Sequence, residues 1–230
     1  NGYVSTNNNA TFLSHDSNIT SINDDPAIRV KANSHVHIEN SNITGSSSGY
    51  EAIWLWNNGS IMLQGTSSVT APSGTSAINL TTASSAVITD DVQINSVDQT
   101  AIYIDKNSVV ELNDNVAVTR SDGNDEIFVD PTSALRINGS DITLANVGCE
   151  GITSYVQDGS NNSVNISNTC NGYQNLIPNF RKISSGTCES NGFQELSSQH
   201  ECSLATGNKV ANITDNNPPH CIESTNNGVR

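Results

Sequence analysis

A short stretch of alternating residues returns along this chain at a nearly constant interval. Ala27-Ile28-Arg29-Val30 is followed by related stretches that begin at Ala52, Ala77, Ala101, Glu126 and Gly151. Successive copies are thus about 25 residues apart, and a fixed period in the twenties is typical of a solenoid. The chain up to about residue 170 is therefore expected to fold as stacked copies of one unit. Its start within a repeat indicates a fragment of a longer protein.

Each repeat holds two further apolar stretches that keep the same register. The first set is Phe12-Leu13, Val36-His37-Ile38, Ile61-Met62-Leu63, Val87-Ile88, Val110-Glu111-Leu112 and Leu135-Arg136-Ile137. The second set is Ile19-Thr20, Ile43-Thr44, Val69-Thr70, Ile94-Asn95, Val116-Ala117-Val118 and Ile142-Thr143. Short alternating runs of this kind are typical of strands with one buried face. Three strands per repeat predict an all-β protein, a parallel β-helix of about six coils, right-handed by the usual twist and crossover preferences.

Isoleucine fills one inward position of almost every predicted coil. The expected inner ladder is Ile28, Ile53, Ile78, Ile102, Ile127 and Ile152. One coil cannot bury its own inner face, so the stability of the fold must come from the stacking of coils. The sequence predicts that Ile78, in the middle of the ladder, is fully buried.

The composition is polar and acidic. The chain has 52 Ser and Thr, 33 Asn, nine Lys and Arg, a net charge of −14 and a pI of about 4.4. Nucleic acid and anionic membranes attract basic patches, so neither is an expected partner, and no segment has the length of a membrane span. Turns exposed all along a narrow solenoid account for the Ser, Thr and Asn content. A soluble extracellular protein is expected.

All five cysteines lie toward the carboxyl end of the sequence, at positions 149, 170, 188, 202 and 221. None of them has the spacing of a zinc site, and their wide intervals fit disulfides in an oxidising compartment. Cys149 and Cys170 are nearly one coil apart, which places them at adjacent levels, and Cys188 and Cys202 can close a small loop. Cys221 is then left to pair beyond the end of this sequence, between chains, or by a different scheme.

The repeat pattern ends near residue 170. We expect a β-helix over 1–170, a connection over 171–183 and a cysteine-rich module over 184–230 that this sequence truncates. The module contains Gly186-Thr187-Cys188, Gly192-Phe193, Glu201-Cys202 and Pro218-Pro219-His220-Cys221. It resembles a small cysteine-rich module of secreted and surface proteins in marine algae and related protists, with His220 where that family has Gly. The resemblance implies a secreted eukaryotic protein and no catalytic residue. A short helix is expected over 198–206.

Nine Asn-x-Ser/Thr sequons are candidate glycosylation sites. They are Asn9, Asn18, Asn42, Asn58, Asn79, Asn138, Asn161, Asn165 and Asn212. With this composition roughly seven or eight would arise by chance, so the number alone does not indicate glycosylation. Occupancy of some of them is expected if the source is a eukaryote or an archaeon.

Outward positions of the Ala-Ile strand form an aromatic and basic row. The candidate residues of this face are Arg29, Lys31, Trp54, Trp56, Tyr103 and Phe128. Exposed aromatic side chains on a rigid face indicate a protein partner or a stacked sugar. The remaining alternative is that another segment of the chain covers them.

Two further groups are candidate metal sites. His35, His37 and Glu39 alternate on one strand, and Asp recurs in turns at 24–25, 90–91, 122 and 125. Solvated strand histidines and turn aspartates usually have no metal, because turn Asp bonds its own backbone. We expect no metal and no cofactor, with calcium at the turn carboxylates as the alternative.

The predicted fold resembles that of pectin lyases and related polysaccharide enzymes, and a fold alone does not establish an activity. Such activities need clustered carboxylates with nearby basic residues. Here Arg29 and Lys31 cluster beside aromatic residues, and no Ser-His-Asp or Cys-His pattern stands out. The sequence therefore favours a non-enzymatic structural or adhesive glycoprotein of a surface appendage, cell covering or filament, which associates with itself or with other extracellular proteins. A β-helix that binds or cleaves carbohydrate is the alternative.

Overall fold

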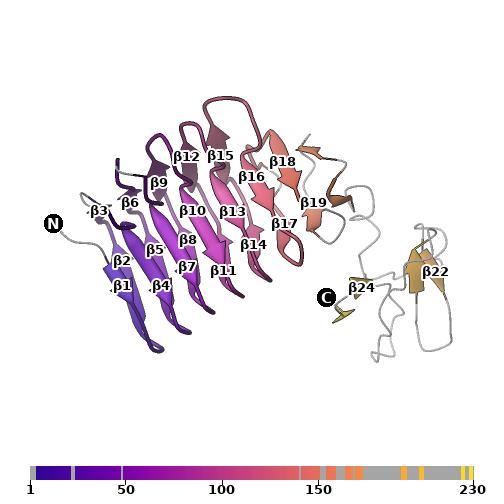
Figure 1. Cartoon of the computed structure of the whole chain (residues 1–230), viewed down its shortest axis with the longest axis horizontal. Helices are drawn as coiled ribbons and strands as arrows, with labels where there is room; N and C mark the ends of the chain where they lie inside the picture. The colour runs from indigo at the N-terminus through magenta and orange to yellow at the C-terminus, as the bar shows by residue number, and fades with distance from the viewer. Residues whose placement is uncertain are drawn as a thin grey trace. The chain divides into compact units, whose positions relative to one another are not determined.

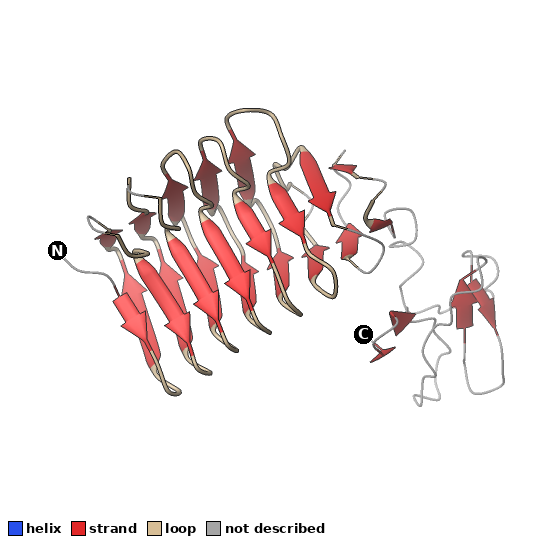
Figure 2. Ribbon diagram, in the orientation of Figure 1, coloured by secondary structure: helices blue, strands red, loops and turns tan. Residues whose placement is uncertain are grey.

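A computed structural model describes most of the repeat region and four short strands beyond it. The described residues are 4–21, 24–47, 49–139, 141–150, 154–158, 164–167, 169–172, 193–195, 202–204, 224–225 and 228–229. The chain divides into two compact units, Asn1–Gly172 and Tyr173–Arg230. All regular structure in the described residues is β-strand (Figure 2). No helix able to cross a membrane is found in the described part of the chain.

The first unit is a parallel β-solenoid, as the repeat predicted (Figure 1). Sheet A contains β1 (Val4–Thr6), β4 (Ile28–Lys31), β7 (Ile53–Trp56), β10 (Ile78–Thr81), β13 (Ile102–Ile104), β16 (Ile127–Val129), β18 (Asn146–Cys149) and β20 (Asn165–Ile166). Sheet B contains β2 (Thr11–His15), β5 (His35–Glu39), β8 (Ser60–Gln64), β11 (Ser85–Ile88), β14 (Val109–Leu112), β17 (Ala134–Ile137), β19 (Tyr155–Asp158) and β21 (Asn171–Gly172). Sheet C contains β3 (Asn18–Thr20), β6 (Asn42–Thr44), β9 (Ser68–Ala71), β12 (Gln93–Ser96) and β15 (Ala117–Arg120).

Five coils have a strand in each of the three sheets, one fewer than the sequence predicted. In the next coil the third side keeps only an isolated parallel bridge between Ala117 and Thr143. Ile142 is still buried there, so the inward position of the predicted strand is correct although a regular strand is not formed.

The isoleucine ladder forms the centre of the core. Ile78 pairs in register with Ile53 on one side and Ile102 on the other, and all three are completely buried. The prediction for Ile152 is wrong, because Val147 takes the place opposite Ile127. The spacing from Ile127 to Val147 is shorter than the repeat period of about 25 residues. This coil is shorter because it has no regular strand in sheet C. Ile152 itself lies outside the described residues.

Left-handed backbone at the corners gives a structural role to seven of the 33 asparagines. Between sheets A and B, five successive coils turn through two consecutive residues with φ of 48–64°. These pairs are Asn8-Asn9, Ala32-Asn33, Asn57-Asn58, Thr82-Ala83 and Lys106-Asn107. Between sheets B and C each coil uses one such residue, at Asp16, Asn40, Gly65, Asp90 and Asp114. Asn, Asp and Gly adopt this conformation most readily, which explains why they fill most of these corner positions.

Buried serines join the coils at the start of sheet B. The Ser108 hydroxyl accepts a hydrogen bond from the backbone N–H of Ser84, at 3.2 Å, and the Ser133 hydroxyl accepts one from Ser108, at 3.3 Å. Gly59 takes the same place in its coil, where a Cβ atom would lie 2.5 Å from the carbonyl oxygen of Val30. The polar composition is thus built into the coil interfaces.

The second unit is described only by two antiparallel strand pairs. β22 (Phe193–Glu195) pairs with β23 (Cys202–Leu204), and β24 (Ser224–Thr225) pairs with β25 (Gly228–Val229). The helix predicted over 198–206 is wrong where β23 crosses that segment. Cys188 and Cys221 lie outside the described residues, as does the side chain of Cys202, so the predicted pairing of Cys188 with Cys202 stays a prediction.

Candidate interaction face

The outer surface of sheet A brings the predicted aromatic and basic residues together. Arg29, Trp54, Asn79, Tyr103 and Phe128 are successive register partners across β4, β7, β10, β13 and β16. A second row holds Lys31, Trp56 and Thr81, and it continues to Asp105 and Asp130 just past the ends of their strands. We call Arg29, Lys31, Trp54, Trp56, Tyr103 and Phe128 the aromatic face.

The two tryptophans form a parallel pair with a cation beside each ring. The rings of Trp54 and Trp56 are inclined by 4° and their centroids are 5.7 Å apart. The Arg29 guanidinium carbon lies 5.1 Å from the Trp54 ring centroid, and the Lys31 Nζ lies 6.0 Å from that of Trp56. Cations over indole rings attract the ring electrons and hold the side chains in place. Trp56 remains 42% exposed, so the pair presents a fixed apolar surface to solvent.

The basic residues of this face differ in how they are neutralised. Arg29 forms an ion pair with Asp25 at 2.6 Å, and its side chain is 19% exposed. Lys31 has no ion pair among the described residues, whereas Lys106, Arg120 and Arg136 each have one. Lys31 therefore carries an unneutralised charge next to the exposed Trp56.

The other end of the face is acidic. Tyr103 and Phe128 stack with centroids 5.6 Å apart, and the Tyr103 hydroxyl donates a hydrogen bond to Asp130 Oδ1 at 3.1 Å. Burial, with the Asp130 carboxylate beside the ring, raises the pKa of Tyr103 to about 12. Burial, followed by the hydrogen bond and negative charge of Asp130, raises the pKa of Asp105 above its ordinary value. We call Asp105 and Asp130 the carboxylate pair.

The carboxylate pair is expected to reduce stability at neutral pH. A raised folded-state pKa for Asp105 means that its contribution to stability is complete below the unfolded value of about 3.8 and is lost as pH rises through the folded value. Asp105→Asn should therefore raise the free energy of unfolding at pH 7 by up to about 1 kcal/mol, the scale of facing like charges on neighbouring strands. Thermal melts should show a gain of a few degrees at pH 7 that disappears near pH 3.

Asp98 supplies a control of opposite sign. A hydrogen bond from the backbone N–H of Gly74, at 2.7 Å, and one from the Ser73 hydroxyl lower the pKa of Asp98. Its stabilising effect is present above the unfolded pKa and is lost as pH falls, so Asp98→Asn should lower the melting temperature at pH 7. If Asp105→Asn also lowered it, the carboxylate pair would not be a source of repulsion.

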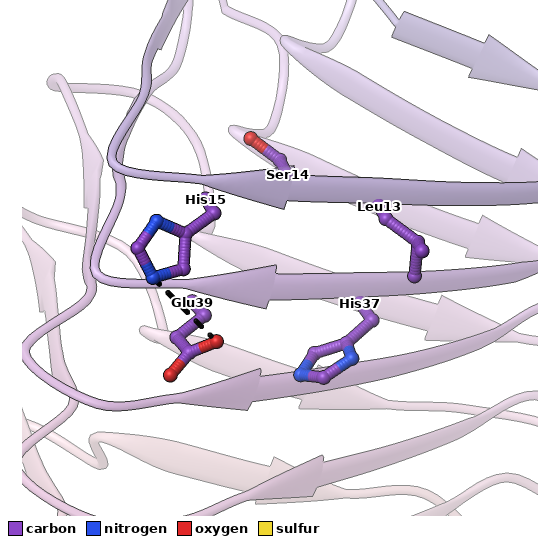
Figure 3. Close-up of a pocket in the computed structure, with 5 residues that line it drawn as sticks. All are labelled: Leu13, Ser14, His15, His37 and Glu39. Atoms are coloured by element: carbon purple, nitrogen blue, oxygen red, sulfur yellow. Dashed lines mark ion pairs between the residues drawn. The ribbon is translucent and has the colours of Figure 1, made fainter.

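The predicted histidine group shares the outward face of β5. His35 Nδ1 is hydrogen-bonded to Ser60 Oγ at 2.9 Å, while His37 and Glu39 line a shallow pocket of about 290 Å³ with Leu13, Ser14 and His15 (Figure 3). His15 Nε2 lies 3.8 Å from Glu39 Oε2. His15 was not among the predicted residues; it lies on the neighbouring coil, in register with Glu39. No group of three or more metal-ligating residues occurs in the described part of the chain.

The turn aspartates are occupied by hydrogen bonds between and within turns. Asp90 accepts from the backbone N–H of Gly65 at 2.9 Å, and Asp122 accepts from that of Asn124 at 3.1 Å and pairs with Arg120. This is the ordinary role of Asp in turns. These contacts give Asp90 and Asp122 a structural role in their turns.

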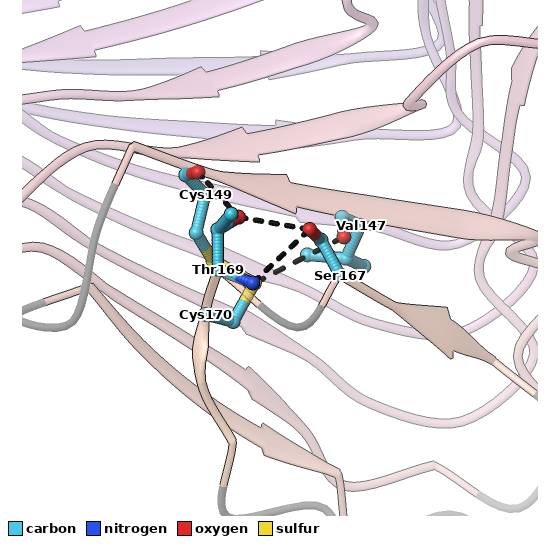
Figure 4. The surroundings of a disulfide bond; sticks show 5 residues. All are labelled: Val147, Cys149, Ser167, Thr169 and Cys170. Atoms are coloured by element: carbon cyan, nitrogen blue, oxygen red, sulfur yellow. Dashed lines mark hydrogen bonds between the residues drawn. A yellow bond between two sulfur atoms is a disulfide. The ribbon is translucent and has the colours of Figure 1, made fainter.

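Cys149 and Cys170 form a disulfide, the first of the pairings that the spacing suggested (Figure 4). Their Cα atoms are 4.9 Å apart, and both residues are buried. The Thr169 hydroxyl donates to the carbonyl oxygen of Cys149 at 2.8 Å, and the backbone N–H of Cys170 donates to that of Ser167. The bridge thus ties the last described turn to β18.

Most described sequons are accessible. Exposed asparagines are Asn9, Asn18, Asn42, Asn58, Asn138 and Asn165. Asn79 is half-buried within the first row of sheet A, where its amide donates to Glu51 Oε1 at 2.9 Å. A glycan at Asn79 would have to replace this contact. Asn161 and Asn212 lie outside the described residues.

Comparison of the chain with protein-family models, curated proteins and solved structures finds no match. The aromatic face is therefore interpreted from its own geometry and chemistry.

Proposed function

We propose that this chain is a non-enzymatic, extracellular structural or adhesive protein whose β-solenoid works by association through the aromatic face. The observation that carries the proposal is the fixed Trp54–Trp56 pair, with 42% of Trp56 exposed on a sheet whose stability lies in its inner ladder. Tryptophan and arginine dominate binding energy at protein interfaces. The expected setting is a surface appendage, a cell covering or a filament, with glycosylated turns and a pectin-lyase-like coil arrangement.

The arrangement of carboxylates favours binding over hydrolysis. The Asp130 carboxylate is close enough to raise the pKa of Asp105, whereas the two carboxyl groups of glycosidases are about 5–9.5 Å apart to admit the sugar or a water molecule. The basic groups on the same sheet lie next to tryptophans at the other end of the face. This separation of charges suits a contact surface.

A carbohydrate-binding protein is the second candidate. Parallel indole rings on a rigid strand also suit stacking against sugar rings. In that case the same residues bind a glycan and leave self-assembly unaffected.

The experiment is the double substitution Trp54→Ser with Trp56→Ser in the full chain. Light scattering and electron microscopy should show at least tenfold less assembly into oligomers or filaments, because the exposed indole surface is lost. The melting temperature should change little, since both side chains point away from the core. Loss of glycan-array binding with assembly intact would select the carbohydrate-binding alternative.

A matched control is Met62→Ser, an outward substitution on sheet B that leaves the aromatic face intact. It should retain full assembly. If the tryptophan variant changed neither assembly nor glycan binding, the pair would be covered by the protein itself and the proposed function would be wrong.

A further inference from the structure

The outer surface of sheet A has a midpoint, with opposite charges at equal distances on its two sides. In the second row, Lys31 lies two coils before Thr81 and Asp130 lies two coils after it. Trp56 lies one coil before Thr81 and Asp105 one coil after it. Thr81 is thus the midpoint between a basic, indole-bearing half and an acidic half.

The first row has the same midpoint. Asn79 separates Trp54 from Tyr103, and beyond these lie Arg29 on one side and Phe128 on the other. An aromatic ring, Trp54 or Tyr103, therefore lies on each side of the midpoint. One coil further out, the Arg29 cation on one side corresponds to the Phe128 ring on the other. Both central residues are short and polar, so they leave room for larger neighbours to approach.

We propose that the aromatic face binds a second copy of the same chain, with the solenoid axes antiparallel and a two-fold axis running along β10 between the copies. This inference rests on the proposed function, since it names the partner of that same face. Rotation about this axis places β4 of one copy opposite β16 of the other, and β7 opposite β13, while the strand direction is kept. Lys31 then meets Asp130 of the second copy, and by symmetry Asp130 meets Lys31.

The remaining contacts of this arrangement are complementary. Trp56 faces the position of Asp105, whose carboxylate is buried and paired with Lys106 at 3.4 Å, so this contact adds apolar area. Trp54 faces Tyr103 as an aromatic pair, and Arg29 faces the Phe128 ring as a cation–π pair. The alternative two-fold axis along the solenoid would set Arg29 against Lys31, a like-charge contact, and is disfavoured for that reason.

The isolated chain carries the two charges that this contact neutralises. Lys31 has no carboxylate partner and Asp130 has no cationic partner among the described residues. Asp130 instead lies against a second carboxylate, Asp105. An incoming lysine from the second copy relieves this repulsion at both ends of the interface at once.

The size of the face sets the strength of the contact. Four coil spacings give a length of about 19 Å and four strand residues a width of about 13 Å, so the two copies together bury only several hundred Å². Stable interfaces bury more than about 1,000 Å² in total. The dimer is therefore weak and reversible, and it weakens further as salt screens the two Lys31–Asp130 pairs.

The test reverses the charge at Lys31 or Asp130 in the full 230-residue chain and measures the dissociation constant of the dimer by sedimentation equilibrium. Lys31→Glu and Asp130→Lys should each weaken the dimer at least tenfold, because each sets two like charges against each other. The double variant should restore association to within a few-fold of the original. An equal mixture of the two single variants should form a mixed dimer. Each of its two charge pairs then joins a carboxylate of one chain to an ammonium group of the other.

Controls of equal charge change are Arg136→Glu on sheet B and Asp91→Lys in a turn, and neither should alter the dissociation constant more than twofold. Monomers at all concentrations, or single variants that associate as well as the original chain, would overturn the proposal. So would failure of the double variant to recover. If assembly still depends on Trp54 and Trp56 in that last case, the proposed function stands and only the two-fold arrangement is wrong.

Discussion

Replacing Ile78 by Asp is expected to unfold the solenoid. Ile78 is completely buried and lies in register between Ile53 and Ile102, so the carboxylate would have no polar partner or water. Loss of the buried aliphatic side chain costs about 2–5 kcal/mol, and burial of an unpaired carboxylate adds several more. The sum approaches the whole stability of an ordinary domain, which is about 5–15 kcal/mol. Circular dichroism should show loss of the strand signal, or a melting temperature lowered by more than about 15 °C.

Thr81→Asp is the matched control, because Thr81 lies on the same strand and points outward. It introduces the same charge at the surface and should shift the melting temperature by only a few degrees. Ile78→Val is a second control, with an expected cost of about 1 kcal/mol. An Ile78→Asp protein that melted like the original would contradict the register of sheet A.

The second large effect is expected from the disulfide. It closes a loop with a sequence separation of 21, for which chain-entropy arguments give a stabilisation of about 3 kcal/mol. The bridge lies beyond the last strand of sheet C, where coils are held by two sheets only. The double variant Cys149→Ser with Cys170→Ser should therefore loosen the final coils before the rest of the solenoid.

Hydrogen exchange resolved by residue is the measurement that separates this from a general loss of stability. Amides of β18 and β19 should exchange at least tenfold faster in the variant, while those of β7 and β10 keep their protection. Non-reducing peptide mapping of the original chain should recover Cys149 linked to Cys170. A variant with unchanged exchange in β18 would show that the bridge adds nothing to the last coils.

The period of the repeat was enough to predict the fold class and most of the inner ladder. A strand alternates its side chains, so Ile53 inward fixes Trp54 and Trp56 outward, and the structure places both there. The rows of the aromatic face could be predicted for the same reason. Their order across coils follows from the parallel register alone.

Other features depend on contacts that a period does not encode. The place of Ile152 in the ladder failed because the coil shortens to bring Val147 opposite Ile127. The effect of Asp130 on the pKa of Asp105 and the pairing of Arg29 with Asp25 depend on geometry beyond the strand ends. The left-handed corners were not predicted either, since Ala, Thr and Lys take positions there that Asn fills in other coils.

The single glycine among the corner serines has a consequence for the order in which the coils come together. Repeated coils with nearly identical apolar ladders allow a misfolded chain in which one coil is looped out and its neighbours stack directly. Such a slip would place Ser84 over Val30, where a Cβ atom on the native Gly59 backbone would lie 2.5 Å from the carbonyl oxygen, so the backbone would have to shift. The missing side chain at Gly59 thus disfavours the slip in which that coil is looped out.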